Sequence, residues 1–264
     1  MNKVIRAEFG RTINAGLIIA IAGIIFSICF DSFNDLIAGL RNGQGYVGYF
    51  FSNAAFGGMC TKYMLPVFTA LPFSVSLCQE RNNKAVSYIV SREGKNRYIF
   101  AKFIVSAISG GFVAVCGTVL LFLMLAMRFP IAGDEFEGAV VSDYFHEWSA
   151  VYYPQIYILT LSILAFCRGV IWSSLALCVS LYTSDFMVVL LSPFLGSYVL
   201  VRIFQIIRVP DMVRPDMILI GQVVIKSSGL TLIIAIAISL TIVTLIGAFF
   251  VGKMKEGLKS GTIY

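Results

Sequence analysis

Residues 230–251 read LTLIIAIAISLTIVTLIGAFFV, an apolar stretch without a single charged side chain. A helix needs about 20 such residues to cross the hydrocarbon core of a bilayer. The strands of a transmembrane barrel instead alternate apolar and polar residues over segments of about 10 residues. The stretch therefore predicts a membrane-spanning helix.

The rest of the chain has the same character. Of its 264 residues 58% are hydrophobic and 13% are charged, whereas soluble proteins carry roughly 25% charged residues. The mean hydropathy is +0.87. These values predict an all-α, multi-pass protein of the cell membrane, with residues 1–264 forming one transmembrane domain. The net charge of +6 does not indicate a nucleic-acid partner, because the basic residues lie in loops between apolar stretches.

Apolar stretches of this kind predict six transmembrane helices. Their predicted bounds are Ile13–Phe30, Tyr63–Gln79, Tyr98–Met127, Gln155–Leu181, Phe186–Ile207 and Leu230–Val251. Only four residues separate the fourth helix from the fifth, so we expect these two helices to be antiparallel neighbours.

The basic residues predict the orientation of the chain, because Lys and Arg concentrate in cytoplasmic loops. With the N-terminus in the cytoplasm, twelve of the 20 Lys and Arg residues fall on the inner side and six on the outer side. The remaining two, Arg168 and Arg202, lie within predicted spans. Both termini are therefore expected to be cytoplasmic.

The chain lacks the motifs for ATP binding, metal binding, Ser-His-Asp catalysis and ion-coupled transport. The chain has no G-x-x-x-x-G-K-[ST] motif, so it has no P-loop of its own for ATP. His146 is the one histidine, and the six cysteines form no C-x-x-C pair, which argues against a metal site and against Ser-His-Asp catalysis. No Asp or Glu lies inside a predicted span, which argues against an ion-coupled carrier. No catalytic residue and no cofactor is expected in this chain.

The loop between the second and third predicted spans, residues 80–97, is short and strongly basic. Val86, Ile89 and Val90 have the i, i+3, i+4 spacing of one helix face, and Gly94 is suited to end such a helix. An amphipathic helix of this kind can insert into a groove on a soluble partner. The plainer alternative is a set of ordinary positive-inside charges. The residues that we single out for docking are Glu80, Arg81, Lys84, Val86, Ile89, Val90 and Arg92.

Two further segments predict short helices at the membrane surface. Ile5, Phe9 and Ile13 recur every four residues, so the N-terminal segment is expected to lie in the inner interface, with an ordinary basic flank as an equal alternative. The stretch 207–228 is apolar but too short to span, and it contains Pro210 and Pro215. It predicts a pair of short re-entrant or interfacial helices before the last span.

Arg168 lies near the middle of the fourth predicted span. A charge at that depth is costly and must face the helix bundle or water. With no acid in the spans, its partner would be backbone carbonyls, a neighbouring protomer, or a polar or anionic substrate. Arg168 is thus a candidate for a transport pathway or an interface, with a structural role in helix packing as the alternative.

Taken together, the pattern resembles the permease subunit of type-two ABC exporters, the ABC-2-type family, over nearly the whole chain. The resemblance is carried by the basic N-terminal segment, the six predicted spans, and the stretch from Glu80-Arg81 through Ser91-Arg92 and Arg97 to Ala101-Lys102. The predicted helical pair before the last span also resembles family members.

The resemblance implies a dimer with a second copy or a homologous permease, seated on separate cytoplasmic ABC ATPase subunits that bind ATP and Mg²⁺. The segment around residues 82–91 would be the coupling helix. The substrate would be an amphipathic molecule such as a peptide, drug or lipid, exported from the cytoplasm or the membrane. Two other functions stay open on the residues alone: a passive channel or carrier that uses Arg168, and a non-transporting scaffold whose basic loops bind anionic membrane lipid.

Overall fold

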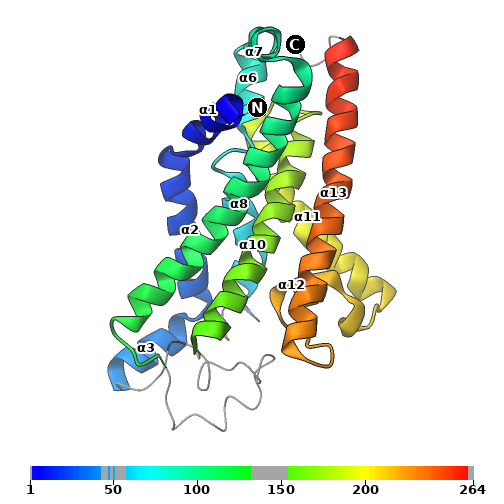
Figure 1. Ribbon diagram of the computed structural model, residues 1–264. Helices are drawn as coiled ribbons and strands as arrows, with labels where there is room; N and C mark the ends of the chain where they lie inside the picture. The colour runs from blue at the N-terminus through cyan, green and yellow to red at the C-terminus, as the bar shows by residue number, and fades with distance from the viewer. Residues whose placement is uncertain (1, 43–46, 48–49, 51–57, 132–153, 261–264) are drawn as a thin grey trace.

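The computed structural model describes residues 2–42, 47, 50, 58–131 and 154–260, and these form a bundle of helices (Figure 1). No strand occurs in these ranges, which confirms the all-α prediction. The helices are α1 (Asn2–Thr12), α2 (Ala15–Asp31), α3 (Phe33–Asn42), α5 (Met59–Ala70), α6 (Ser76–Asn82), α7 (Val86–Glu93), α8 (Lys95–Ala126), α10 (Pro154–Val179), α11 (Phe186–Ile207), the 3₁₀ turn η3 (Asp211–Val213), α12 (Pro215–Ile220) and α13 (Ser228–Ser260).

Four of the described helices, α8, α10, α11 and α13, are long and apolar enough to cross a membrane. The pair formed by α1 and α2, bent by 57° at its break, is a fifth candidate. The residues of the second predicted span instead form two short helices, α5 and α6, joined by a turn at residues 71–75. Pro66 lies inside α5 and Pro72 in the turn, and proline removes a backbone donor that a continuous helix needs.

The bend between α1 and α2 is built by Asn14. Its side-chain oxygen accepts a hydrogen bond from the Leu17 backbone amide at 3.1 Å, which caps the start of α2. Its amide nitrogen donates to the Pro72 carbonyl oxygen at 3.4 Å. One side chain therefore both starts α2 and joins it to the turn between α5 and α6.

Helices α8 and α10 form the centre of the bundle and make its most extensive helix–helix contact. Glycines allow this close approach: a Cβ atom built on Gly169 would lie 2.4 Å from the Gly110 carbonyl oxygen, and one built on Gly110 would lie 2.4 Å from Ser173. Small residues that bring helix backbones together are typical of membrane interfaces, where packing replaces the hydrophobic effect between helices.

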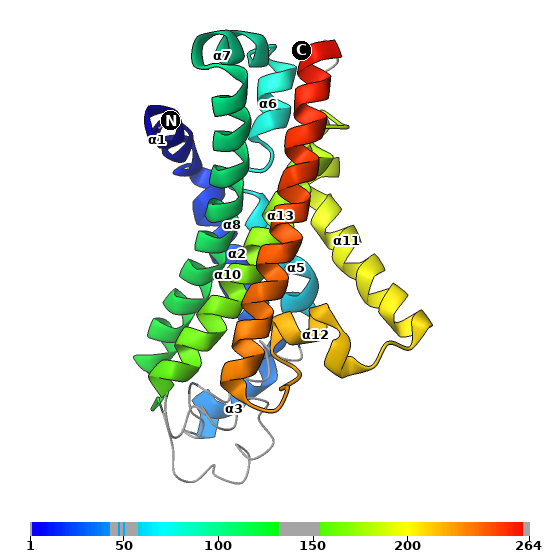
Figure 2. The same ribbon diagram turned by 45° about the vertical axis from the view of Figure 1, so that its right-hand side comes forward.

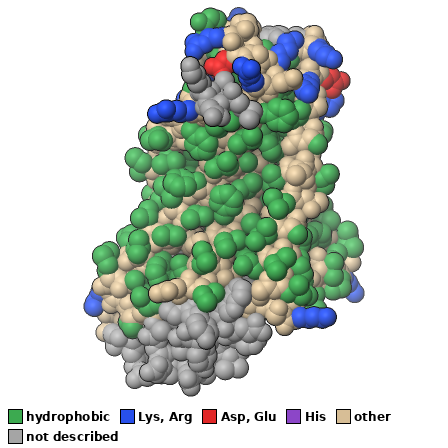
Figure 3. Space-filling view, viewed as in Figure 1, with side chains coloured by type: hydrophobic (Ala, Val, Ile, Leu, Met, Phe, Trp, Pro, Cys, Tyr) green, Lys and Arg blue, Asp and Glu red, His purple; other side chains and the backbone are tan. Residues whose placement is uncertain are grey.

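The surface follows the expectation for a membrane protein. Apolar side chains cover the surface between the two ends of the bundle, and Lys and Arg side chains gather mainly at the end that carries α1 and α7 (Figure 3). The described parts of both chain ends lie at that same end (Figures 1 and 2). Together with the four long apolar helices, this distribution is that of a helical membrane protein.

The segment before α13 contains the short helical elements that the sequence predicts. The turn η3 and helix α12 follow α11, and the chain then reverses at Gly221, whose φ of +86° favours glycine. Ile218, Leu219 and Ile220 of α12 are buried. Helix α12 packs on α10 and α13 at the end of the bundle opposite α7 (Figure 2).

Candidate functional site

A buried ionic cluster joins three helices directly beneath α7. Lys102 of α8 is completely buried, and its Nζ lies 2.8 Å from Glu80 Oε1 of α6 and 3.1 Å from Glu8 Oε2 of α1. Arg11 of α1 adds its Nη1 at 2.6 Å from Glu80 Oε1 and 3.3 Å from Glu8 Oε1. Glu8, Arg11, Glu80 and Lys102 are named the ionic cluster below.

Further contacts satisfy Glu80 and Lys102. Tyr98 donates its hydroxyl to Glu80 Oε2 at 2.5 Å, and Lys102 Nζ donates to Ser76 Oγ at 3.1 Å. The ammonium group also lies 4.7 Å from the centre of the Phe73 ring, within the range of a cation–π contact. Two carboxylates and two cations balance each other, which is the condition under which buried charges are tolerated.

The sequence predicted Glu80 as a docking residue for a partner, whereas the structure buries it in the ionic cluster. The pairing of Glu8 with Lys102 was missed altogether. A signal was present: Lys102 follows Phe100 and Ala101 and precedes Phe103 in the apolar run of α8. A lysine in that setting needs an acid from another segment, and Glu8 is the one acid in the described part of α1.

Helix α7 sits at the end of the bundle with its apolar stripe turned inward. Val86 and Val90 are buried against Tyr98 and Ile99 of α8, in a cluster that also contains residues of α6, α10 and α13, and Ile89 is half-buried beside them. The stripe predicted to enter a groove on a partner therefore packs on the chain's own core. The outer face of α7 is left exposed and consists of Ser87, Tyr88, Ser91 and Arg92, and Lys84 is exposed in the turn just before the helix.

Arg81 is also engaged within the chain. Its Nη1 donates to the carbonyl oxygens of Ser180 at 2.9 Å and Leu181 at 3.2 Å, just beyond the C-terminus of α10. A basic side chain suits this position because the last carbonyls of a helix lack intrahelical donors. Of the seven predicted docking residues, only Lys84 and Arg92 are exposed.

A groove runs beside this end of the molecule, between the start of α2 and the α6 and α11 helices. Its cavity volume is about 780 Å³, and Arg11, Glu80 and Ile89 contribute to its lining. The groove and the outer face of α7 lie at the same end of the bundle. The charged residues of the groove lining, Arg11 and Glu80, pair with each other, whereas the α7 side carries the exposed Lys84 and Arg92.

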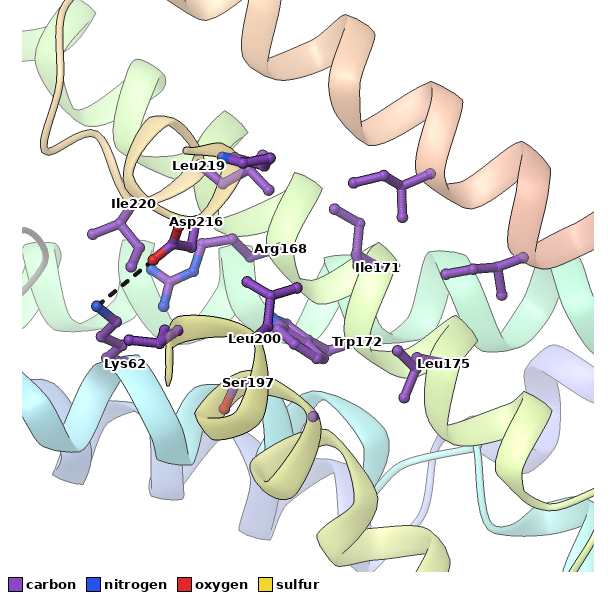
Figure 4. Close-up of a pocket in the computed structure, with 15 residues that line it drawn as sticks. Lys62, Arg168, Ile171, Trp172, Leu175, Ser197, Leu200, Asp216, Leu219 and Ile220 are labelled. Carbon is purple, nitrogen blue, oxygen red and sulfur yellow. Dashed lines mark ion pairs between the residues drawn. The ribbon is translucent and has the colours of Figure 1, made fainter. Parts of the chain in front are cut away.

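Arg168 lies in a second pocket, in the half of the bundle nearer α12 (Figure 4). Its side chain is 7% exposed, and Nη2 donates to the Thr61 carbonyl oxygen at 3.5 Å. Among the described residues no carboxylate lies within ion-pair distance of it. Backbone carbonyls were among the partners predicted for Arg168, and the structure provides one, the Thr61 carbonyl, at a long hydrogen-bond distance.

Asp216, the second residue of α12, binds the two neighbouring cations, Arg214 and Lys62. Asp216 accepts hydrogen bonds from Arg214 at 2.8 and 3.2 Å, and Lys62 Nζ lies 4.0 Å from it. The hydrogen bond from Arg214 to Asp216 raises the pKa of Arg214. Burial lowers the pKa of Lys62; Asp216 opposes this shift, and the neighbouring Arg214 and Arg168 add to it.

Two groups of residues thus combine burial with charge: the ionic cluster beneath α7 and the pocket around Arg168. Within the described ranges no group of three or more His, Cys, Asp or Glu residues could hold a metal ion. Comparison with protein-family models, curated proteins and solved structures gives no match to this chain.

Proposed function

We propose that this chain is the membrane-spanning subunit of an ATP-driven exporter of the type-two ABC kind. In this proposal it has six spans and two cytoplasmic termini, and it moves an amphipathic substrate out of the cytoplasm or the membrane. A separate ATPase subunit hydrolyses the ATP. One observation carries the proposal: α7 has an exposed outer face for a partner and an inner face that is joined to the long helices.

The connection from α7 to the membrane helices is a single residue. Gly94 alone separates α7 from α8, with a φ of +86° that glycine adopts without strain. Val86 and Val90 pack against the first turns of α8. A displacement of α7 is therefore passed to α8 rather than absorbed by a loop.

The same displacement reaches the N-terminal helix through the ionic cluster. Glu80 lies in α6, a few residues before α7, and it binds both Lys102 of α8 and Arg11 of α1. Asn14, the N-cap residue of α2, lies at the bend between α1 and α2. Motion of α1 would therefore change the angle at that bend. This arrangement suits a protein whose spans are moved from the cytoplasmic side, with α1 lying along the inner interface.

The two outer helices support the dimer that this function requires. Helices α11 and α13 are the least buried of the four long helices. In the most apolar 18-residue segment of each, only 22% and 17% of the residues are buried. Their free faces carry large apolar side chains such as Leu195, Ile203, Ile233 and Leu240. In the proposal these faces meet lipid and the second permease.

The double variant Tyr88→Ala/Arg92→Ala tests the docking role of α7. Tyr88 is 68% exposed and Arg92 is also exposed, so the variant removes partner contacts without opening the core. Stimulation of the ATPase subunit by the permease in proteoliposomes is expected to fall by about tenfold or more, as for loss of an aromatic and arginine hot spot. Insertion and thermal unfolding are expected to stay unchanged.

Arg128→Ala is the matched control, because Arg128 is an exposed arginine just after α8, at the end of the bundle opposite α7 (Figure 2). It is expected to leave ATPase stimulation intact. Full stimulation by the Tyr88/Arg92 variant would remove α7 as the docking element.

A further inference from the structure

The pocket around Arg168 has a charged end and an apolar end. Lys62, Arg168 and Asp216 lie together at one end, while Trp172 and Leu175 follow along α10 toward the other (Figure 4). The cavity volume is about 160 Å³. A polar head at the first end and an apolar chain along the second would match this division.

The charged end has more cations than anions. Lys62 and Arg214 both pair with Asp216, whose side chain is 8% exposed. Arg168 lines the same pocket without an ion pair to any described carboxylate. The other acid nearby, Asp211, has a side chain that is 69% exposed and binds Arg214. An uncompensated buried charge is costly, so the charged end favours a guest that carries a negative charge.

Arg168 is the side chain best placed to bind that guest. It is more than nine-tenths buried, it lines the pocket, and its one hydrogen bond to a described residue is the 3.5 Å contact with Thr61. The planar guanidinium presents several donors in a fixed fork that fits the oxygens of a carboxylate or a phosphate. Most of these donors have no partner in the part of the chain that the structure describes, so they can serve a ligand.

The apolar end is bounded by three helices. Ile171, Trp172 and Leu175 of α10 form its floor, Leu200 of α11 forms one wall, and Ile242 and Ile246 of α13 form the other. Helix α11 leans away from α13 toward the end that carries α12 (Figure 2). This divergence leaves the pocket bordered by two helices whose outer faces are apolar and exposed, so an acyl chain can lie there in contact with the bilayer.

We propose that this pocket binds an anionic membrane lipid, with its phosphate between Arg168 and Lys62 and an acyl chain between α11 and α13. The site does not depend on the proposed export function, because an exporter, a channel and a scaffold could each hold such a lipid. The purified chain alone is sufficient to test it.

Trp172 supplies the readout, since it lines the pocket and the chain has two tryptophans. In a Trp148→Phe background, Trp172 is the only one left; Trp148 lies outside the described residues. The protein is reconstituted in phosphatidylcholine vesicles that contain increasing fractions of brominated phosphatidylglycerol or, separately, brominated phosphatidylcholine. Bromine quenches tryptophan fluorescence on contact, so the titration reports lipid in the pocket.

Brominated phosphatidylglycerol is expected to reach half-maximal quenching at a mole fraction about tenfold or more below that of brominated phosphatidylcholine, as for one or more charge-assisted hydrogen bonds. Arg168→Gln is expected to abolish this preference. Lys62→Gln should reduce it, and Arg168→Lys should retain part of it. The exposed Arg202→Gln control should keep all of it.

Three results would overturn the proposal. The first is equal quenching by the two brominated lipids in the parent protein. The second is an unchanged preference in both Arg168→Gln and Lys62→Gln, each checked for normal elution by size-exclusion chromatography. The third is relief of quenching by millimolar inorganic phosphate with no preference between the lipids, which would identify a site for a free anion instead.

Discussion

Replacing Lys102 by Met is expected to lower the midpoint of thermal unfolding in detergent by roughly 10 °C. The substitution leaves Glu8 and Glu80 buried with only the half-exposed Arg11 as a counter-charge. Breaking one side of a buried ion pair costs about 3–5 kcal/mol, because the remaining charge stays uncompensated. Fluorescence-detected size-exclusion chromatography after heating measures the midpoint.

The double variant Glu8→Gln/Lys102→Met is the control for this prediction. It removes one charge of each sign, so the cluster keeps Arg11 and Glu80 at 2.6 Å as a balanced pair. We expect it to be more stable than Lys102→Met alone, although it carries one more substitution. If the losses of stability of Glu8→Gln and Lys102→Met simply add in the double variant, the charges of Glu8 and Lys102 are not coupled.

The second large effect is expected for Gly169→Leu, which should prevent α8 and α10 from packing. The new Cβ would lie 2.4 Å from the Gly110 carbonyl oxygen and 2.9 Å from the Gly111 Cα. These atoms belong to the backbone, so they cannot rotate away, and the two helices must separate. A loss of about 3 kcal/mol or more is expected, seen as aggregation or a strongly lowered midpoint in the same chromatographic assay.

Gly252→Leu is the matched control in the last long helix. A Cβ atom at Gly252 meets nothing within 4 Å, and leucine favours a helix over glycine by roughly 1 kcal/mol. This variant should be as stable as the parent or slightly more stable. Normal stability of Gly169→Leu would contradict the close α8–α10 contact.

Much of the fold follows from hydropathy alone. The predicted span Phe186–Ile207 coincides with α11, and the predicted third and fourth spans end within three residues of α8 and α10. Long apolar runs have one outcome in lipid, because every backbone polar group must be satisfied within the helix. The second predicted span is not one continuous helix: two prolines and a turn divide it into α5 and α6, and hydropathy does not report where such a chain breaks.

The candidate sites were harder to predict, because they are made by residues far apart in the chain. The spacing of Val86 and Val90 correctly indicates one apolar face, but not whether the protein itself or a partner covers it. Glu80 is a charged residue in a predicted cytoplasmic loop, which favours a docking role. Only the tertiary fold reveals that it binds Lys102 and Arg11.

The pocket around Arg168 illustrates the same limit. The position of Arg168 in an apolar run predicts a buried charge, and the structure confirms its burial. Lys62 and Asp216, which lie far from it in sequence, reach the same pocket through α5 and α12. No local pattern places these three residues together.

In the proposed exporter a separate ATPase docks on this chain. Affinity purification of the tagged chain from its own host in mild detergent tests this directly, with mass spectrometry and an ATPase assay on the eluate. The proposal predicts that a P-loop ATPase co-purifies with the parent chain and with Arg128→Ala, and is lost with Tyr88→Ala/Arg92→Ala. Correctly folded parent and control chains that both elute without any ATPase would contradict the proposal.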